Sequence, residues 1–496
     1  MMSSFEEVLI GDVCSVGDGA HSKVKRIHTG VPYLTSKNIG QGNLKLEKLD
    51  YISEESFEKL FPKSSKATRR PQRGDVLFGI IGTFGNAYLY KEDDHFGFSS
   101  SIGVLRPDPE KIDSEYLYYV VSSRVFKSNH ANHNAGSVQG YTNIPTVKSL
   151  SLPLPPLVEQ RRISKILKSL DDKIELNRQT NQTLEHIAQA IFKSWFVDFE
   201  PTRAKIAAKQ IGQARHDSER SAALREALLA DGRWPEAVAA AIAEGDPERA
   251  AMAAISGKSL DELDQLNPEQ REQLRTTTAL FPDALVDSEL GEIPEAWGIK
   301  SLSEIIEVIG GGTPKRSEES YWGGDIPWFS VKDAPSLSDV FVVDTIEQIT
   351  EQGVNKSSTK LLPVGTTIIT ARGTVGKLAL TGTPMCMNQS CYGIRGLDGF
   401  GPYFNYFNLR EAITTLQRNT HGAVFDTITT QTFESYSMPI ATGELVDNFE
   451  DVVTPLLKKI EMNSREITTL NKLRDVLLPK LLSGELATNP TIEECA

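Results

Sequence analysis

The 496-residue sequence contains no long apolar run and only four cysteines. No apolar stretch reaches the length of about 18 residues that a transmembrane helix needs, so we expect no membrane span. The first residues, MMSSFEEVLIGDV, have neither the basic region nor the apolar core of a signal peptide. Cys14, Cys386, Cys391 and Cys495 are scattered, without the spacing of a disulfide framework or a metal site. The sequence therefore predicts a protein of the reducing cytoplasm.

Recognisable catalytic motifs are also missing. No GxGxxG follows a predicted strand, and no Asn-Pro-Pro-aromatic motif for amino-group methylation occurs. Residues 371–377 (ARGTVGK) resemble the start of a phosphate-binding loop, but Leu378 stands where a hydroxyl would have to reach Mg²⁺. His130 and His133 lie in an Asn-rich segment, SNHANHN, which we expect to be a polar loop and not a metal site. We therefore expect no catalytic residue, no metal ligand and no cofactor in this chain.

The net charge of −13 is unfavourable for nucleic-acid binding over the whole surface, but the charge is unevenly distributed. Between Asp18 and Asp50 there are six basic residues and one acidic residue, and residues 62–73 contain five basic residues and no acidic one. Residues 200–290 hold 17 acidic and 11 basic residues. Because an acidic protein can still present a basic face to phosphates, composition permits DNA binding without demonstrating it.

Residues 152–199 carry the pattern around which the chain is organised. After Pro155 and Pro156, apolar residues recur at alternating steps of four and three with no Gly or Pro until Pro201. Such a repeat of 3.5 residues over more than four heptads is typical of a coiled-coil seam. The predicted seam residues are Ile163, Leu167, Leu170, Ile174, Asn177, Leu184, Ile191 and Trp195.

The same pattern recurs 286 positions later, where KIELN of residues 173–177 is matched by KIEMN of residues 459–463. Either helix alone could be an ordinary amphipathic core helix, but the duplication favours pairing of the two with each other. In an antiparallel pair, Asn177 and Asn463 would lie near mid-helix and could hydrogen-bond to each other. The second seam consists of Phe449, Val453, Leu456, Ile460, Asn463, Ile467, Leu470, Leu477 and Leu481.

Each predicted helix follows a globular half with similar motifs. Val31–Asn38 (VPYLTSKN) is echoed by Ile326–Asp333 (IPWFSVKD), and residues 74–86 are echoed by residues 365–377. We expect an α+β protein with two similar mixed α/β domains and two long antiparallel helices in a coiled coil. The predicted segments are 1–154, a first mixed α/β domain; 155–200, the central helix; 201–290, a helical connection; 291–440, a second mixed α/β domain; 441–486, the C-terminal helix; and 487–496, a tail.

Local signals refine this prediction. Apolar runs predict strands at Val31–Leu34, Val76–Ile81, Ala87–Tyr90 and Ile102–Leu105, and Ser114–Phe126 is predicted to be a helix capped by Ser114. In residues 201–290, Ser259-Leu-Asp-Glu262 has the pattern of a capping box. We interpret this helical segment as a spacer, with a docking surface for a partner as the alternative.

Several polar and basic residues in the two halves are candidates for contacts with DNA. Two Gly-Thr-x-Gly turns allow close backbone approach, and matched strands end in Lys37-Asn38 and Lys332-Asp333. The candidate residues are Lys37, Asn38, Lys63, Lys66, Arg69, Arg70, Arg73, Thr83, Asn86, Lys332, Asp333, Arg372, Thr374 and Lys377.

Four segments resemble the specificity subunits of type I restriction–modification systems: 152–163 (LPLPPLVEQRRI), 196–199 (FVDF), 288–297 (SELGEIPEAW) and 477–486 (LLPKLLSGEL). The resemblance covers nearly the whole chain; residues 441–446 (ATGELV) depart from the PPLVEQ that precedes the first helix. It implies that each half is a target recognition domain for one part of a split, asymmetric DNA site. It also implies two adenine-N6 methyltransferase (modification) subunits, which bind S-adenosylmethionine, and restriction subunits, which use ATP and Mg²⁺.

Two other classes remain open at this point. A non-enzymatic DNA-binding regulator with a coiled-coil scaffold would bind its site specifically without partner chains. An enzyme in its own right would turn over a nucleotide or use a metal ion as the lone chain.

Overall fold

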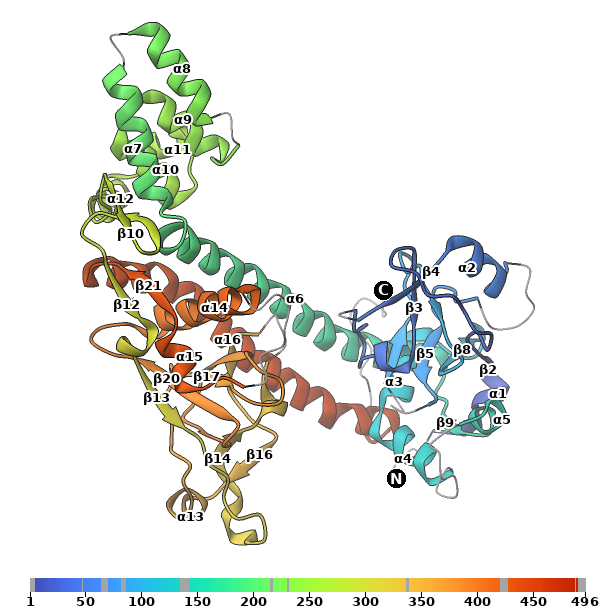
Figure 1. Ribbon diagram of the computed structural model, residues 1–496. Coiled ribbons are helices and arrows are strands. Elements are labelled where there is room, and N and C mark those ends of the chain that lie inside the picture. The colour runs from blue at the N-terminus through green and yellow to red at the C-terminus, as the bar shows by residue number, and fades with distance from the viewer. Residues whose placement is uncertain are drawn as a thin grey trace. The chain divides into compact units, whose positions relative to one another are not determined.

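The computed structural model describes residues 5–46, 48–63, 70–81, 86–133, 142–214, 217–229, 232–335, 339–419, 427–486 and 488. The chain forms two compact units (Figure 1): unit 1 contains residues 1–174 and 469–496, and unit 2 contains residues 175–468. The helices α6 (Leu157–Phe196) and α16 (Gly443–Leu482) each contribute to both units. Of the helices in the described residues, none is long and apolar enough to cross a membrane.

The described residues of unit 1 form three sheets, with strand orders β2-β8-β5-β6, β4-β3-β7 and β1-β9. The strands are β1 (Glu7–Leu9), β2 (Cys14–Asp18), β3 (Val31–Leu34), β4 (Asp50–Ile52), β5 (Val76–Gly79), β6 (Ala87–Leu89), β7 (Gly97–Phe98), β8 (Ile102–Pro107) and β9 (Ser151–Pro153). The helices are α1 (Ile10–Val13), α2 (Glu54–Leu60), α3 (Ser114–Ser122), α4 (Arg124–His133) and α5 (Ile144–Lys148), with a short 3-10 turn, η1 (Ser36–Asn38).

The four-stranded sheet of unit 1 is apolar on both faces, because successive strand residues point to opposite sides. Phe78 and Leu105 pack with α3, whereas Leu77 and Val104 pack with residues of the three-stranded sheet. The sheet therefore forms the middle layer of unit 1.

Unit 2 repeats these sheets, with β15 added at the edge of the larger sheet and with the separate pair β10-β11. Its sheets have the orders β13-β20-β17-β18-β15, β16-β14-β19, β12-β21 and β10-β11. The strands are β10 (Leu285–Ser288), β11 (Gly291–Pro294), β12 (Gly298–Ser301), β13 (Ile306–Gly310), β14 (Trp322–Phe329), β15 (Phe341–Val342), β16 (Glu347–Ile349), β17 (Thr367–Thr370), β18 (Leu378–Thr381), β19 (Cys386–Met387), β20 (Cys391–Gly396) and β21 (Ser437–Ile440). The helices that accompany them are α13 (Glu351–Asn355), α14 (Pro402–Asn419) and α15 (Thr430–Glu434), with the 3-10 turns η3 (Leu302–Glu304), η4 (Glu319–Tyr321) and η5 (Val331–Asp333).

The larger sheet of unit 2 is again a middle layer. Ile369 and Leu380 pack with the aromatic residues of α14, whereas the adjacent Ile368 and Ala379 pack on the other side with Phe329 and its neighbours. The position of α14 beside the sheet is visible in Figure 1.

A half-buried carboxyl group on α16, that of Glu450, caps α14. The backbone N–H of Phe404 donates to Glu450 Oε1 at 2.6 Å. A Cβ on Gly401 would lie 2.3 Å from Glu450 Cδ, so glycine is needed there for the side chain to reach the helix terminus. Burial raises the pKa of Glu450 to about 7, against the opposing effect of the backbone hydrogen bonds.

This raised pKa predicts a pH-dependent contribution to stability. The folded protein favours the protonated Glu450, so the contribution is complete below about pH 4.5 and is lost as the pH rises through about 7. The substitution Glu450→Gln keeps a side-chain oxygen that can accept from the Phe404 N–H and removes the ionisable carboxyl group. Between pH 5 and pH 8 the variant should therefore gain roughly 3 kcal/mol relative to the wild type. Calorimetric unfolding at both pH values measures the change, with the exposed Glu444→Gln as the matched control; an equal pH slope in all three proteins would contradict this assignment.

The predicted seam is buried in part. The buried seam residues are Ile163, Leu167, Ile174, Asn177, Trp195, Phe449, Val453, Ile460, Asn463 and Leu481, whereas Leu170, Leu184, Ile191, Leu456, Ile467, Leu470 and Leu477 are half-buried. In unit 2, Ala188 and Trp195 of α6 share one apolar cluster with Phe449 and Val453 of α16. In unit 1, Ile163 and Leu167 share a cluster with Leu478, Leu481 and Leu482. Residues with higher numbers on α6 pack against residues with lower numbers on α16, so the helices are antiparallel within each unit. The predicted fold class is therefore confirmed.

The predicted hydrogen bond between Asn177 and Asn463 is wrong by one helical turn. Asn463 Nδ2 donates to Asn181 Oδ1 at 2.8 Å, and Asn177 Nδ2 donates to Glu466 Oε2 at 2.9 Å. The sequence repeat aligned equivalent residues, but the packing of the two antiparallel helices pairs Asn463 with the next seam position of α6.

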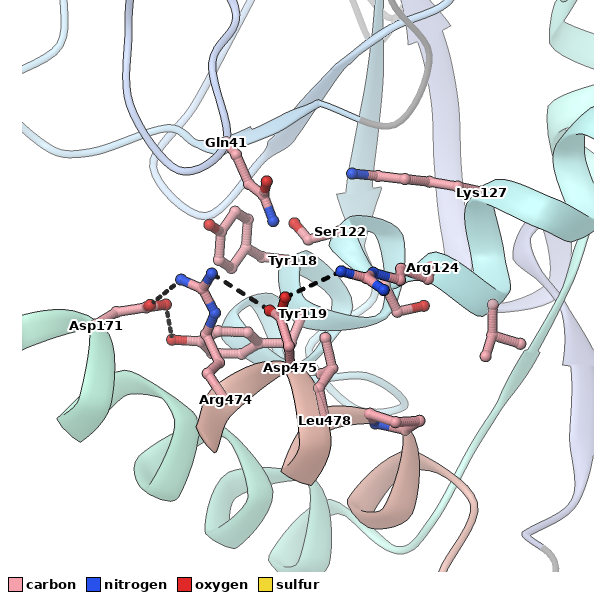
Figure 2. Close-up of a pocket in the computed structure, with 13 residues that line it drawn as sticks. Gln41, Tyr118, Tyr119, Ser122, Arg124, Lys127, Asp171, Arg474, Asp475 and Leu478 are labelled. Atoms are coloured by element: carbon pink, nitrogen blue, oxygen red, sulfur yellow. Dashed lines mark hydrogen bonds and ion pairs between the residues drawn. The ribbon is translucent and has the colours of Figure 1, made fainter. Parts of the chain in front are cut away.

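In unit 1, a polar network joins α3 and α4 to the paired helices (Figure 2). Tyr119 of α3 donates to Asp171 Oδ2 at 2.9 Å, and Arg474 Nη1 donates to Asp171 Oδ1 at 2.7 Å. Arg124 of α4 binds Asp475 at 3.3 Å. Burial, followed by the charge of Asp171, raises the pKa of Tyr119, so its hydroxyl stays protonated and able to donate.

Residues 200–279 of unit 2 form a helical group with its own apolar core. Ala207, Ile211, Ile242 and Ala253 belong to that core, and Lys205 Nζ donates to the carbonyl of Phe281 at 2.6 Å. The predicted capping box at Ser259 is confirmed. The helices are α7 (Glu200–Gln213), α8 (Ser218–Leu229), α9 (Glu236–Glu244), α10 (Pro247–Ser256), α11 (Leu260–Asp264) and α12 (Pro268–Ala279). Whether the segment is a spacer or a docking surface stays a prediction.

Three local predictions are wrong. The helix predicted over Ser114–Phe126 is divided, because α3 ends at Ser122 and α4 begins at Arg124. Asp113, and not Ser114, caps α3, because its side chain accepts from the N–H of Tyr116. The segment of His130 and His133 was expected to be a loop, but residues 124–133 form α4. The four predicted strands are present in β3, β5, β6 and β8, with ends that differ by up to two residues.

Candidate DNA-recognition surface

The glycine turn between β17 and β18 presents three of the candidate residues. Gly373 and Gly376 have φ values of 81° and 87°, which side-chain-bearing residues rarely adopt. The turn leaves Arg372, Thr374 and Lys377 exposed. Their side chains are therefore available to phosphates or base edges.

At the ends of the matched strands β3 and β14, the second residue of each candidate pair is used within the fold. Asn38 Oδ1 accepts from Thr35 N at 2.9 Å, while Asn38 Nδ2 donates to two backbone carbonyls. Asp333 Oδ2 accepts from Ser330 N, and its Oδ1 accepts from Ile346 N at 2.7 Å. These side chains hold η1 and η5 in place, which leaves Lys37 and Lys332 as the exposed members of each pair.

The basic run of residues 62–73 is only partly open. Lys63 is exposed, whereas Arg70 binds Glu58 through both Nη atoms and donates to the carbonyl of Phe61. Arg73 pairs with Glu92 at 2.9 Å. Lys66 and Arg69 lie outside the described residues, so the structure gives no geometry for them.

The sequence segment of unit 1 that matches Gly373–Gly376 includes Thr83, which also lies outside the described residues. Asn86, which follows it, is half-buried and donates from Nδ2 to the carbonyl of Ile39 at 3.1 Å. Its amide therefore stabilises a neighbouring loop.

Sequence patterns did not identify Thr313 and Gln389, which the fold brings together. Thr313 follows β13, Gln389 lies between β19 and β20, and Thr313 Oγ1 donates to Gln389 Oε1. The only signal was the short echo of FSSS at residues 98–101 by MNQS at 387–390, in which a single serine is shared.

The described residues offer no metal centre, since none of their His, Cys, Asp and Glu side chains form a group of three or more that could hold an ion. A cavity of about 170 Å³ in unit 1 lies around the network of Figure 2, where Asp171, Arg474, Asp475 and Arg124 are paired with one another. We interpret this network as structural.

Comparison with known proteins identifies the class. The sequence model of the "Type I restriction modification DNA specificity domain" matches residues 2–186 and 294–463. The chain therefore belongs to the family of type I restriction–modification DNA specificity subunits, the non-catalytic components that recognise the DNA target. The helical group of residues 200–279 lies between the two matched ranges.

Similar proteins include two specificity subunits and one solved structure. The Type I restriction enzyme HindI specificity subunit of Haemophilus influenzae is 31% identical over 438 residues, which cover 85% of this chain and 88% of the relative. The MjaIX specificity subunit of Methanocaldococcus jannaschii is 28% identical over 189 residues, covering 38% of this chain and 44% of the relative. The crystal structure of the S subunit from M. genitalium aligns over 98% of this chain and 97% of its own, with 14% identity and a TM-score of 0.46.

Proposed function

We propose that the two mixed α/β regions, one in each unit, each read one part of a split, asymmetric DNA site. The observation that carries this proposal is the repeated strand order: β4-β3-β7 with β2-β8-β5-β6 in unit 1, and β16-β14-β19 with β13-β20-β17-β18 in unit 2. A repeated scaffold with different exposed residues suits two readers of unlike sequences, because base contacts specify and phosphate contacts position. The exposed candidates Lys37, Lys63, Lys332, Arg372, Thr374 and Lys377 are the proposed DNA contacts.

The partners proposed for this chain are two modification subunits, which would methylate adenine N6 with S-adenosylmethionine. Restriction subunits that use ATP and Mg²⁺ would join the complex. We assign these cofactors to the partner chains. Because the proposed complex acts on cellular DNA, we propose that it is located in the cytoplasm.

Duplicated apolar residues outside the seam support two equivalent docking sites. The 286-residue shift relates Ile166 to Val452, Leu176 to Met462 and Ile187 to Leu473. The exposed fractions agree within each pair: 37% and 36%, 57% and 64%, 44% and 44%. Single exposed apolar residues are common, but three pairs matched in position and exposure support equivalent docking residues on the two helices for one kind of partner.

Reconstitution tests this function. The isolated chain should not methylate DNA, whereas its mixture with the modification subunit and S-adenosylmethionine should methylate a split motif. The double variant Leu176→Asp, Met462→Asp should weaken association with the modification subunit at least tenfold, because each site would bury a charge against an apolar partner. Analytical ultracentrifugation measures the association, with the exposed Leu361→Asp as the control.

Methyl transfer by the purified chain alone would contradict the proposal. Unchanged association of the double variant would show that the duplicated residues do not form the docking sites.

A further inference from the structure

Both units contain the same set of five backbone hydrogen bonds at one end of the three-stranded sheet. We call these bonds and the backbone segments that they join the frame. In both, a turn that follows a two-residue strand is held by three neighbouring segments of the unit. In unit 2 the bonds are Gly312 N to Met387 O (2.9 Å), Asn388 N to Phe329 O (2.9 Å), Ala371 N to Ser390 O (2.8 Å), Cys391 N to Asn388 O (3.2 Å) and Ile428 N to Ala371 O (3.0 Å).

Unit 1 reproduces each of these five bonds. They are Ala20 N to Phe98 O (2.9 Å), Ser99 N to Leu34 O (2.9 Å), Ile80 N to Ser101 O (3.0 Å), Ile102 N to Ser99 O (3.0 Å) and Thr142 N to Ile80 O (3.1 Å). No matched pair of distances differs by more than 0.2 Å, the difference between 2.8 and 3.0 Å and between 3.2 and 3.0 Å. The backbone of the frame is therefore the same in both units.

A glycine presses the first loop against the turn in each frame. A Cβ on Gly311 would lie 2.0 Å from Asn388 O, and a Cβ on Gly19 would lie 2.3 Å from Phe98 O. Distances this short leave no space for a side chain, so loop and turn are held together. Side chains that project from the frame therefore start from fixed backbone positions.

The side chains at matched positions of the frame differ in chemistry. The bonds relate Ala20 to Gly312, Ile80 to Ala371 and Ser99 to Asn388, so the next residues also correspond. The resulting pairs are His21 and Thr313, Ile81 and Arg372, and Ser100 and Gln389. A fixed backbone with variable, accessible side chains is what one scaffold requires to read two different sequences.

Gln389 has the chemistry and the support to read a base. Its side chain is exposed, and its amide oxygen accepts from Thr313 Oγ1, which limits the rotamers of the side chain. An amide oxygen has a second lone pair, and the amide nitrogen carries two donors. The side chain can therefore form the paired acceptor and donor contacts that an adenine presents through N6 and N7 in the major groove.

We propose that Gln389, positioned by Thr313, reads an adenine in the half-site recognised by unit 2, and that Ser100 occupies the same place in unit 1. This inference rests on the proposed function, because it requires each unit to read one half-site. It adds a specificity-determining residue and the base that this residue selects.

The test uses the complete complex of this chain with its modification subunit and a DNA library randomised at every position of the motif. Gln389→Ser, which installs the residue of unit 1, should lower discrimination at one A·T pair roughly 5- to 150-fold, the range for a good bidentate contact. Thr313→Val should cause a smaller loss at the same base pair. Ser100→Gln should alter only the other half-site, and the exposed Gln352→Ser should leave the motif unchanged.

Three results would overturn the inference. Equal weakening on all sequences would make Gln389 a phosphate contact, an unchanged motif would exclude it from recognition, and relaxation at a G·C pair would contradict the adenine assignment. Melting temperatures equal to the wild type exclude misfolding as the cause. A wild-type complex that methylates no split motif would overturn the proposed function as well, and so is distinct from a failure of Gln389 alone.

Discussion

Lengthening both long helices by one heptad should widen the gap between the two half-sites and leave both half-site sequences unchanged. The heptads belong after Thr180 and after Arg465. These positions keep Asn181 with Asn463 on one side and Asn177 with Glu466 on the other. They also leave Arg465 beside Gly382, to whose carbonyl it donates.

The expected size follows from helix geometry. Seven residues add roughly 10 Å to each helix, which corresponds to about three base pairs at ~3.4 Å each. Three base pairs also rotate the groove by roughly 100°, so DNA or protein must twist and affinity should fall. Methylation of DNA with variable spacers should show a gap longer by about one to three base pairs. An unchanged gap in a folded, active protein with both insertions would show that the helices do not set the spacing. As a control, a heptad inserted in one helix alone should prevent the two long helices from pairing along their full length.

Replacing unit 1 by that of another specificity subunit should change one half-site completely and preserve the other. The exchange has to include residues 1–174 together with 469–496, since both segments form unit 1. Under the proposed function, unit 2 makes the base-specific contacts to the retained half-site, so the sequence of that half-site should persist in the methylated motif. Simultaneous change of both half-sites would contradict independent reading.

A narrower exchange provides the control. Replacing residues 1–150 alone removes Tyr119 and Arg124 but retains their partners Asp171 and Asp475. Unless the donor domain supplies an equivalent tyrosine, this hybrid should lose about 1–3 kcal/mol of stability, because the hydrogen bond from the Tyr119 hydroxyl to the Asp171 carboxylate is lost while Arg474 still pairs with both carboxylates. Thermal unfolding of the two hybrids measures the difference.

The paired helices could be predicted from the sequence because their signal is periodic and long. Seam residues such as Ile163 and Leu481 are buried, as a 3.5-residue repeat requires. The pairing of Asn463 with Asn181 could not be predicted, since a sequence repeat aligns equivalent positions and contains no information on the offset between two packed helices.

The recognition residues were harder to predict, because polar residues in loops serve the fold and the ligand alike. Asn38 and Asp333 matched between the halves, yet both side chains cap their own turns. Gln389 and Ser100 share no residue type, and only the matched backbone bonds make them equivalent. Similarity of sequence thus identified the shared scaffold, whereas the residues that differ on it required the structure.

A map of N6-methyladenine in host DNA, with this chain present and deleted, tests the central claim most directly. We expect one split, asymmetric motif to be methylated in the presence of the chain and to lose its methylation on deletion, while the modification subunit remains. Persistence of the same methylated motif without the chain would contradict its role as the subunit that selects the DNA site.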